Sequence, residues 1–226
     1  SLRRQRQMCI RDRADAVADT GSRPAFAEAI ALSGVRYAFA PAQAEDGAPV
    51  AQGNAPFALG PIDLRIARGE ILFIAGDNGS GKTTFLKLLT GLYVPQAGTV
   101  TVDDEAVTDA SRDSYRQLFS PVLSDFHLFE ALPDEPGLAS AQRDEIARAG
   151  LVRLALDGKV AVDDGAFSTI DLSTGQRKRL ALVHAWVEAR PVMVFDEWAA
   201  DQDPSFRHQF YTCLLYTSDA ADEGLG

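Results

Sequence analysis

A glycine-rich segment with one lysine lies between an apolar run and a helix-like pattern. Its residues are Gly76, Asp77, Asn78, Gly79, Ser80, Gly81, Lys82, Thr83 and Thr84. The pattern G-x-x-x-x-G-K-[ST] in this context predicts a loop that binds nucleotide phosphates. Glycines let backbone N–H groups converge on the phosphates, and the following helix adds its partial positive charge. We expect Lys82 to reach the β- and γ-phosphates and Thr83 to bind Mg²⁺. A chance glycine-rich turn is the alternative.

Two adjacent acidic residues follow a second apolar run, Val192–Phe195. A buried strand here would bring Asp196 to its carboxyl end, where α/β sheets place their ligands. Asp196 could hold the Mg²⁺ ion, and Glu197 could act as the catalytic residue that orients or deprotonates an attacking water molecule. An acidic cap at a strand end is the plain alternative. This pattern supports a nucleotide site only in combination with the phosphate-binding loop.

A third pattern opens the helical stretch that extends to Glu188, and its residues are Leu172, Ser173, Thr174, Gly175 and Gln176. A serine and a glycine backbone at a helix N-terminus predict a second anion site. One domain does not need two sites for the same phosphate, so we expect this one to serve the nucleotide of a partner. An ordinary serine N-cap with a glycine nearby is the alternative. The order of the three patterns favours the functional interpretation.

The elements that must position these residues alternate between strands and helices. Apolar patterning predicts strands at 30–39, 62–66, 70–75, 98–102, 105–107 and 191–195, and helices at 83–92, 139–156 and 174–188. Because Glu70–Ala75 is an apolar run that precedes a glycine-rich turn, we expect a fully buried strand of a parallel sheet. Residues 41–56 are typical of a solvated loop. The order of elements predicts an α/β fold.

Together, the three motifs resemble Walker A, Walker B and the signature motif of the nucleotide-binding domain of ABC transporters. The resemblance covers nearly all of Leu32–Thr212. It implies a P-loop NTPase core with a parallel sheet, an antiparallel β subdomain, truncated C-terminal strands and an inserted helical subdomain at about 111–170 that contacts a membrane domain. It also implies ATP and Mg²⁺ as cofactors. A head-to-tail homodimer would hold each ATP between one copy's phosphate loop and the other copy's signature motif.

The resemblance assigns several further positions. The aspartates of the D-loop are Asp201 and Asp203. The family stacks an aromatic ring on the adenine, and alignment favours Phe39, with Tyr37 second. A core aromatic on an alternating strand is an equal alternative. Ser124 stands where the family has the glutamine of its Q-loop, and its shorter hydroxyl could still reach Mg²⁺ or a water molecule.

Two features are expected to take no part in the nucleotide site. His208 lies only eleven residues after Glu197, too early for the family's switch histidine, so we expect a surface histidine. The family's histidine would lie beyond the part of the domain that this chain retains. The basic run Arg177–Arg179 is expected on a solvated helix face rather than in contact with nucleic acid.

A finer resemblance comes from the runs LSTGQRKRLAL, DEWAADQDP and GPIDL, which are similar to the cyclic-peptide and siderophore exporter branch. Trp198 stands where a proline usually follows the catalytic glutamate. This resemblance implies the motor domain of an exporter at the cytoplasmic face of the bacterial inner membrane. A soluble ABC-type ATPase acting in DNA repair or on the ribosome is the alternative. The net charge of −10 argues against nucleic acid as a partner, and the signature motif argues against a metabolic kinase.

The two ends of the chain differ from the rest. Residues 1–13 and 213–226 resemble translated adapter DNA from sequencing libraries, because one duplex read from opposite strands encodes Arg3–Asp12 and Cys213–Asp222. We therefore expect a natural segment of about 14–212, with 14–31 a linker from a missing transmembrane domain. No apolar run approaches the roughly 18–20 residues of a membrane helix. We expect the fragment to be soluble and nearly inactive as an ATPase.

Overall fold

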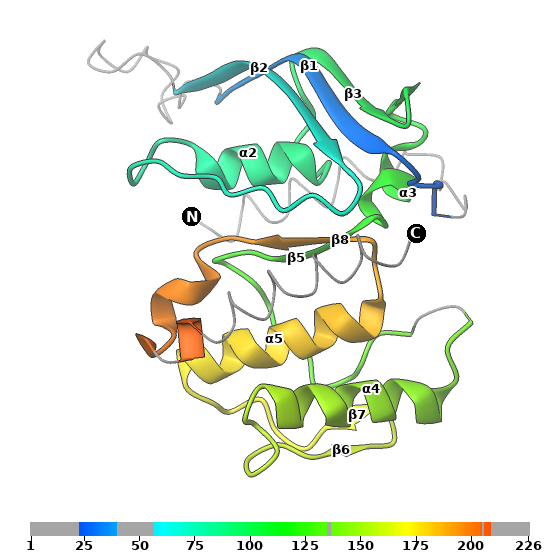
Figure 1. The fold of residues 1–226 in the computed structure, drawn as a ribbon, viewed down its shortest axis with the longest axis vertical. Helices are drawn as coiled ribbons and strands as arrows, with labels where there is room; N and C mark the ends of the chain where they lie inside the picture. The colour runs from blue at the N-terminus through cyan, green and yellow to red at the C-terminus, as the bar shows by residue number, and fades with distance from the viewer. Residues whose placement is uncertain (1–22, 40–56, 135–136, 205, 209–226) are drawn as a thin grey trace, which may run out of the picture.

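A computed structural model describes residues 23–39, 57–134, 137–204 and 206–208 (Figure 1). The interpretations placed on both adapter-like ends and on the loop at 41–56 concern residues outside these ranges. The described elements form layers in Figure 1: an antiparallel sheet, a short helix, a pair of parallel strands and two longer helices. This layered α/β arrangement confirms the fold class expected from the sequence.

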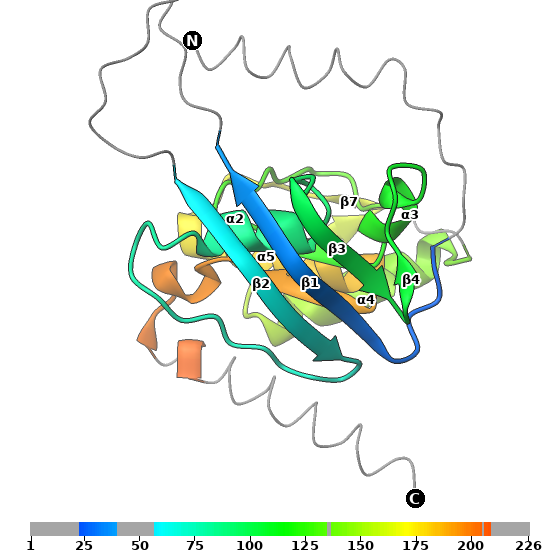
Figure 2. The ribbon, with the colours of Figure 1, turned by 90° about the horizontal axis from the view of Figure 1, so that it is seen from above.

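An antiparallel sheet forms one outer layer of the molecule (Figure 2). Its strands, in hydrogen-bonded order, are β2 (Ala58–Ala67), β1 (Ala29–Ala38), β3 (Ala97–Val102) and β4 (Glu105–Ala106). Leu32 in the central strand is paired with Leu64 on one side and with Val100 on the other. Asp103 and Asp104 turn the β3–β4 hairpin with φ of 48° and 67°. Such positive values are typical of two-residue hairpin turns.

Helix α2 (Lys82–Leu89) lies between this sheet and the parallel strands (Figure 1). Its buried side chains follow the helical spacing that the sequence predicted, and they are Phe85, Leu86, Leu88 and Leu89. The helix ends before Gly91, whose φ of 71° lies in the left-handed region that favours glycine. A Cβ atom at Gly91 would also lie 3.0 Å from the Tyr115 ring. Both observations explain the predicted end of this helix.

The parallel strands β5 (Phe119–Val122) and β8 (Val192–Phe195) pair in register, with Phe119 opposite Val192 and Val122 opposite Phe195. The sequence predicted β8 but not β5. Pro121 lies inside β5 and cannot donate a backbone hydrogen bond, which weakens the sequence signal of a strand. The short helix α3 (Arg112–Arg116) precedes β5.

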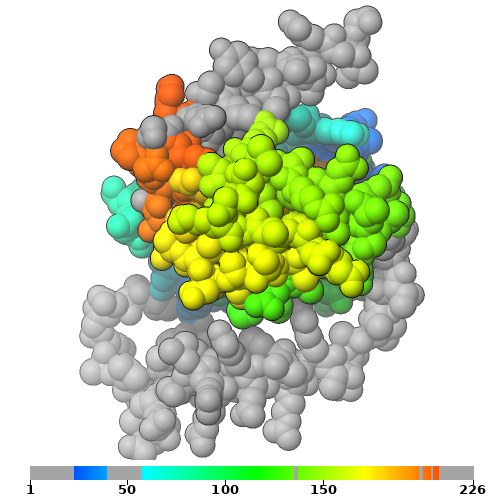
Figure 3. Space-filling view, turned by 90° about the horizontal axis from the view of Figure 1, so that it is seen from below, coloured from blue at the N-terminus to red at the C-terminus, as the bar shows by residue number. Residues whose placement is uncertain are grey.

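The helices α4 (Ser140–Arg153) and α5 (Thr174–Glu188) form the opposite layers, with a small hairpin of β6 (Val162–Asp163) and β7 (Ala166–Phe167). Figure 3 shows that green and yellow residues from this region occupy the lower face. A Cβ atom at Gly150 would lie 3.1 Å from the Trp186 ring, so glycine permits the two helices to approach closely. The helix predicted at 174–188 is confirmed with the same bounds, and the helix predicted at 139–156 is confirmed but ends at Arg153.

The prediction of a buried strand at Glu70–Ala75 is wrong. The segment belongs to the connection from β2 to α2 and is not assigned as a strand in the structure (Figure 1). Phe73 is 65% exposed, and Ile71 and Ile74 are both 38% exposed. A buried strand must pair its N–H and C=O groups with a neighbouring strand. Among the described residues no strand pairs with this segment, so its backbone stays at the surface.

Candidate functional site

The phosphate loop closes around the Lys82 side chain. The Lys82 ammonium donates to the carbonyl oxygens of Gly76 and Asp77, both at 2.9 Å. The Ser80 N–H donates to the Asp77 carbonyl at 3.2 Å. Gly79 has a φ of 80°, in the left-handed region that side chains disfavour. The ammonium therefore lies inside a ring of backbone, where it can exchange carbonyl partners for phosphate oxygens.

Gly81 forms the N-cap of α2 with a φ of 97°. This end of the helix has no side-chain cap, and its first turn contains no acidic residue. Most helices satisfy their first N–H groups with a capping side chain. The amino end of α2 therefore presents backbone donors and a partial positive charge to an external anion. A Cβ atom at Gly81 would lie 2.5 Å from the Phe57 ring, and the φ of 97° also disfavours any residue with a side chain.

Thr83, Ser124 and Asp196 meet at the carboxyl ends of the parallel strands. Ser124 follows β5 and Asp196 follows β8, whereas Thr83 lies in the first turn of α2. The Oδ2 atom of Asp196 accepts hydrogen bonds from Thr83 Oγ1 at 2.8 Å and from Ser124 Oγ at 3.0 Å. Asp196 is only 3% exposed, so these two hydroxyl groups satisfy a buried carboxylate.

The three side chains offer oxygen donors only, which is the ligand chemistry that Mg²⁺ prefers. In the described part of the chain no group of three or more His, Cys, Asp or Glu side chains could hold a metal. A set of one carboxylate and two hydroxyls fits an ion that takes its remaining ligands from phosphate and water. The residues present therefore fit Mg²⁺ bound together with a nucleotide.

Glu197 differs from Asp196 in its surroundings. Its side chain is exposed, while the neighbouring Asp196 is buried. Its φ of 49° places it in the left-handed region, which is uncommon for residues other than glycine. The Glu197 carbonyl accepts a hydrogen bond from the Lys178 ammonium at 2.9 Å. The turn after β8 thus directs two adjacent carboxylates to different environments.

The signature motif forms the amino end of α5. Ser173 is the N-cap, and its hydroxyl accepts from the Gln176 N–H at 3.4 Å while the Gln176 side chain accepts from the Ser173 N–H at 3.3 Å. This reciprocal pair is a capping box. A Cβ atom at Gly175 would lie 2.5 Å from the Asp201 carbonyl oxygen. The Gln202 side chain also donates to the Gly175 carbonyl at 3.0 Å. The signature motif is therefore packed directly against the D-loop.

The expectation of a solvated face for Arg177–Arg179 is wrong for two of its members. Lys178 is only 5% exposed, and its ammonium lies 2.7 Å from the Asp201 carboxylate. Arg179 donates to Asp203 at 2.8 Å and to Gln202 at 2.8 Å. Lys178 shares a helix face with residues three and four positions later that are buried, and this spacing could have revealed it. His208, in contrast, is exposed as expected.

An aromatic cluster lies near the phosphate loop and contains Tyr37, Phe39, Phe57 and Tyr93. Tyr37 stacks on Tyr93 with ring centres 5.0 Å apart, and Phe39 meets the Tyr37 ring edge at 5.2 Å. Burial, and secondly the neighbouring Tyr93, raises the pKa of the Tyr37 hydroxyl. Phe39 is 41% exposed. One Tyr37 face is covered by Tyr93, so Phe39 is the more accessible of the two predicted candidates. Phe57, which no sequence motif marks, lies between Phe39 and Gly81.

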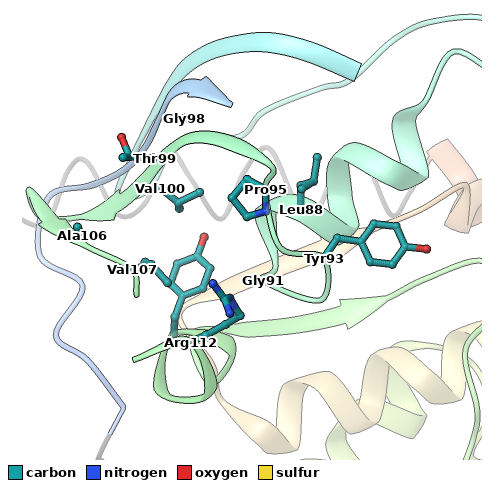
Figure 4. A pocket seen from close by; sticks show the side chains of 11 residues that line it. Leu88, Gly91, Tyr93, Pro95, Gly98, Thr99, Val100, Ala106, Val107 and Arg112 are labelled. Atoms are coloured by element: carbon teal, nitrogen blue, oxygen red, sulfur yellow. The ribbon is translucent and has the colours of Figure 1, made fainter. Parts of the chain in front are cut away.

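A separate small cavity of about 80 Å³ lies between α2, β3 and α3 (Figure 4). Apolar side chains such as Leu88 and Val100 line most of it, and Arg112 at its margin is paired with Asp109 at 2.6 Å. None of the predicted site residues lines this cavity. It is too small for a nucleotide, and it has no role in the site described above.

Comparison with known proteins decides the family. The family model described as "ABC transporter" matches residues 59–200, which include all three motifs. The chain belongs to the ABC transporter family. This ABC domain is 52% identical over 167 residues to the ATP-binding protein SyrD of Pseudomonas syringae pv. syringae, covering 73% of the chain and 29% of that protein. It is 33% identical over 171 residues to the ATP-dependent lipid A-core flippase of Ralstonia nicotianae, covering 70% of the chain and 28% of that protein.

Two solved structures share the fold of this ABC domain. A bacterial Atm1-family ABC exporter with ATP bound matches with a TM-score of 0.64 and 19% identity, covering 96% of the chain and 38% of that structure. CbiO1 from Clostridium perfringens, part of the CbiONQ ABC transporter complex, matches with a TM-score of 0.61 and 23% identity. The match covers 84% of the chain and 74% of that structure. The chain spans less than a third of the length of SyrD and of the flippase. Within the described residues no helix is long and apolar enough to cross a membrane.

Proposed function

We propose that this chain is the ATP-binding and ATP-hydrolysing domain of an ABC exporter. The observation that carries the proposal is the convergence of Thr83 and Ser124 on the buried Asp196 carboxylate, beside the phosphate loop. This arrangement offers a metal site of oxygen ligands next to backbone donors for phosphates. Such a pair of adjacent sites is what a Mg²⁺-bound nucleoside triphosphate requires.

The residues of the loop bind the triphosphate. The backbone of residues 76–81 and the amino end of α2 donate to phosphate oxygens, and Lys82 turns its ammonium from Gly76 and Asp77 to the β- and γ-phosphates. Thr84 continues the first turn of α2 and belongs to the same binding segment. Thr83, Ser124 and Asp196 would hold Mg²⁺, which neutralises phosphate charge when it is bound. Phe39 stacks on the base.

Glu197 acts on the attacking water molecule. Its exposed carboxylate orients the water and accepts a proton as the water oxygen approaches the γ-phosphorus. The bond from the γ-phosphorus to the β–γ bridging oxygen breaks, and ADP and phosphate leave. Leu172–Gln176 face the nucleotide of a second copy, so that a head-to-tail homodimer completes two sites. Asp201 and Asp203 of the proposed D-loop pair with Lys178 and Arg179, which follow this signature motif in α5.

The exporter assignment draws on the relatives. The flippase and the Atm1-family protein are named as exporting or flipping proteins, and the similarity to SyrD extends over most of the chain. We infer that the full-length protein carries a transmembrane domain and lies at the cytoplasmic face of the bacterial inner membrane. A cyclic peptide or peptide siderophore is the proposed cargo, and no nucleic acid partner is expected. A soluble ABC-type ATPase acting in DNA repair or on the ribosome is the second candidate, and the acidic net charge of −10 disfavours it.

The binding part of this proposal is tested by equilibrium titration with a fluorescent ATP analogue and Mg²⁺. Lys82→Ala removes the charge-assisted bonds to the phosphates, and we expect affinity to fall by about 30-fold, or about 2 kcal/mol. The matched control is Lys159→Ala, because Lys159 is exposed and lies in the turn after α4, outside the phosphate loop. Equal affinity in both variants would contradict the assignment of the loop.

The hydrolytic part is tested separately. We expect this chain by itself to bind ATP weakly and to hydrolyse it hardly at all. Residual turnover should disappear in Glu197→Gln while nucleotide binding remains, because the amide cannot accept the proton. Turnover at rates typical of enzymes, abolished by Glu197→Gln, would show that the chain is a complete ATPase and would overturn the expectation of near-inactivity.

A further inference from the structure

A buried lysine ties the signature helix to the backbone of the residue proposed as catalytic. The Lys178 ammonium, on a side chain only 6% exposed, donates to the Glu197 carbonyl at 2.9 Å and pairs with the Asp201 carboxylate at 2.7 Å. Burying an ammonium is costly unless it is paired and hydrogen-bonded. Asp201 supplies the opposite charge, and the Glu197 carbonyl supplies an acceptor. Both partners therefore belong to the turn and D-loop that follow β8.

The contact between helix and turn is reciprocal. The Trp198 indole N–H donates to the Lys178 carbonyl at 2.9 Å, while the Lys178 side chain donates to the carbonyl of the preceding residue, Glu197. Trp198 is 2% exposed and packs among the buried side chains around α5. Two hydrogen bonds in opposite directions thus fix the same peptide segment against one turn of α5.

The segment that is held needs such support. Glu197 has a φ of 49°, a conformation that a side chain with a Cβ atom disfavours. Strained backbone persists only where its surroundings fix it, and it is concentrated at functional sites. The direction of the Glu197 carboxylate follows from this backbone conformation. The Lys178 hydrogen bond to the Glu197 carbonyl acts directly on this backbone.

We propose that Lys178 is a positioning residue that fixes the backbone of Glu197 and of the following D-loop, with Trp198 and Asp201 holding Lys178 in turn. This inference rests on the proposed role of Glu197 in ATP hydrolysis. The Lys178 ammonium is engaged by the Glu197 carbonyl and the Asp201 carboxylate. It acts on the reaction only through the orientation of Glu197.

Two variants of Lys178 and one control separate the contributions of its side chain. Lys178→Met removes both the donor and the charge at nearly constant volume. Lys178→Gln keeps an N–H donor for the Glu197 carbonyl but loses the charge. Lys159→Met is the matched control, because it makes the same substitution at an exposed lysine. Because this chain is expected to hydrolyse ATP slowly, its residual hydrolysis is followed over a long single-turnover time course with protein in excess over ATP, and the affinity for ATP is measured by titration.

We expect Lys178→Met to lower single-turnover hydrolysis by about tenfold or more while the dissociation constant for ATP changes less than about twofold, because a misplaced catalytic group affects the chemical step. Lys178→Gln should recover most of the loss, and Lys159→Met should match the unaltered chain. Unchanged hydrolysis in Lys178→Met would overturn the proposal. An equal loss of binding and hydrolysis would also overturn it, because Lys178 would then support the whole nucleotide site rather than the position of Glu197.

Hydrogen exchange provides a readout that does not depend on ATP. Lys178→Met should speed the exchange of backbone amides at 197–203 while the amides of β1 and β3 remain protected, and Lys178→Gln should restore protection. Unchanged exchange at 197–203 would show that Lys178 does not hold this segment. If the unaltered chain fails to bind ATP, the proposed function falls, whereas the exchange experiment still decides whether Lys178 fixes the turn.

Discussion

Thr83 and Asp196 lie 113 positions apart in the sequence and are joined by a hydrogen bond of 2.8 Å. The bond links the first turn of α2 to the end of β8, so the phosphate loop and the Walker B carboxylate form one site. Ser124 shares the same carboxylate oxygen at 3.0 Å. Ser124 stands at the sequence position where the resemblance places a longer glutamine, and its hydroxyl still contacts the Asp196 carboxylate.

Replacement of Asp196 tests whether this cluster holds Mg²⁺. Asp196→Ala removes the only carboxylate of the cluster, so we expect Mg²⁺ to lose its effect on ATP binding. For the unaltered chain, Mg²⁺ should raise the affinity for ATP by about tenfold, in line with a charged hydrogen-bonded contact. Titrations with ATP in the presence of Mg²⁺ and in the presence of EDTA measure the two affinities for each variant. Asp157→Ala, at an exposed aspartate after α4, is the control and should keep the full Mg²⁺ effect.

Replacement of Phe39 tests the assignment of the base-stacking residue. We expect Phe39→Ala to lower the affinity for ATP by about tenfold, because stacking on a base contributes about 1–3 kcal/mol. Inorganic tripolyphosphate has no base, so its affinity should not change. Phe39→Tyr should restore ATP binding, and Phe129→Ala, at a phenylalanine that is 62% exposed, should have no effect. If ATP and tripolyphosphate affinities fall together, Phe39 supports the fold rather than the base.

The candidate site residues could be proposed from the sequence because each motif is local. Gly76–Thr83, Ser173–Gln176 and Asp196 each carry their chemistry in a few consecutive residues, and the flanking apolar periodicity predicts the helix or strand beside them. The helix Thr174–Glu188 has the predicted bounds, because its serine N-cap marks its first residue clearly.

The features that escaped prediction depend on contacts between distant segments. The helical spacing marks Lys178 as a position on the buried face, but a charged residue in a basic run gives no local sign of the ion pair with Asp201 that stabilises it there. The strand β5 is obscured by Pro121. The apolar run Glu70–Ala75 has the composition of a buried strand, but burial also requires a neighbouring strand with which its backbone can pair.

Replacement of Gly175 tests the contact between the signature motif and the D-loop. A Cβ atom at this position would lie 2.5 Å from the Asp201 carbonyl oxygen, so Gly175→Ala must displace one of the two segments. We expect a loss of stability of about 1–3 kcal/mol, which is typical of overpacking. Thermal unfolding measures this loss. Gly158→Ala is the control, because a Cβ atom there would have no atom within 4 Å. Equal melting temperatures for both variants would contradict the close contact.

The half-buried His184 in α5 should make the stability of the protein depend on pH. Burial lowers the pKa of the His184 imidazole in the folded protein, although its hydrogen bond to the Phe129 carbonyl and the nearby Glu188 oppose this shift. The unfolded chain therefore binds a proton more readily than the folded chain. The contribution of His184 to stability is complete above the unfolded pKa of about 6.5 and is lost as the pH falls below that value.

Chemical unfolding between pH 7.5 and 5.5 measures this loss. The free energy of unfolding should fall with decreasing pH, and the slope should be smaller in His184→Gln, whose side chain does not titrate but can still donate to the Phe129 carbonyl. His208→Gln is the matched control, because His208 is exposed, and it should retain the slope of the unaltered chain. The same slope in His184→Gln as in the unaltered chain would assign the pH dependence to other groups and contradict the role of His184.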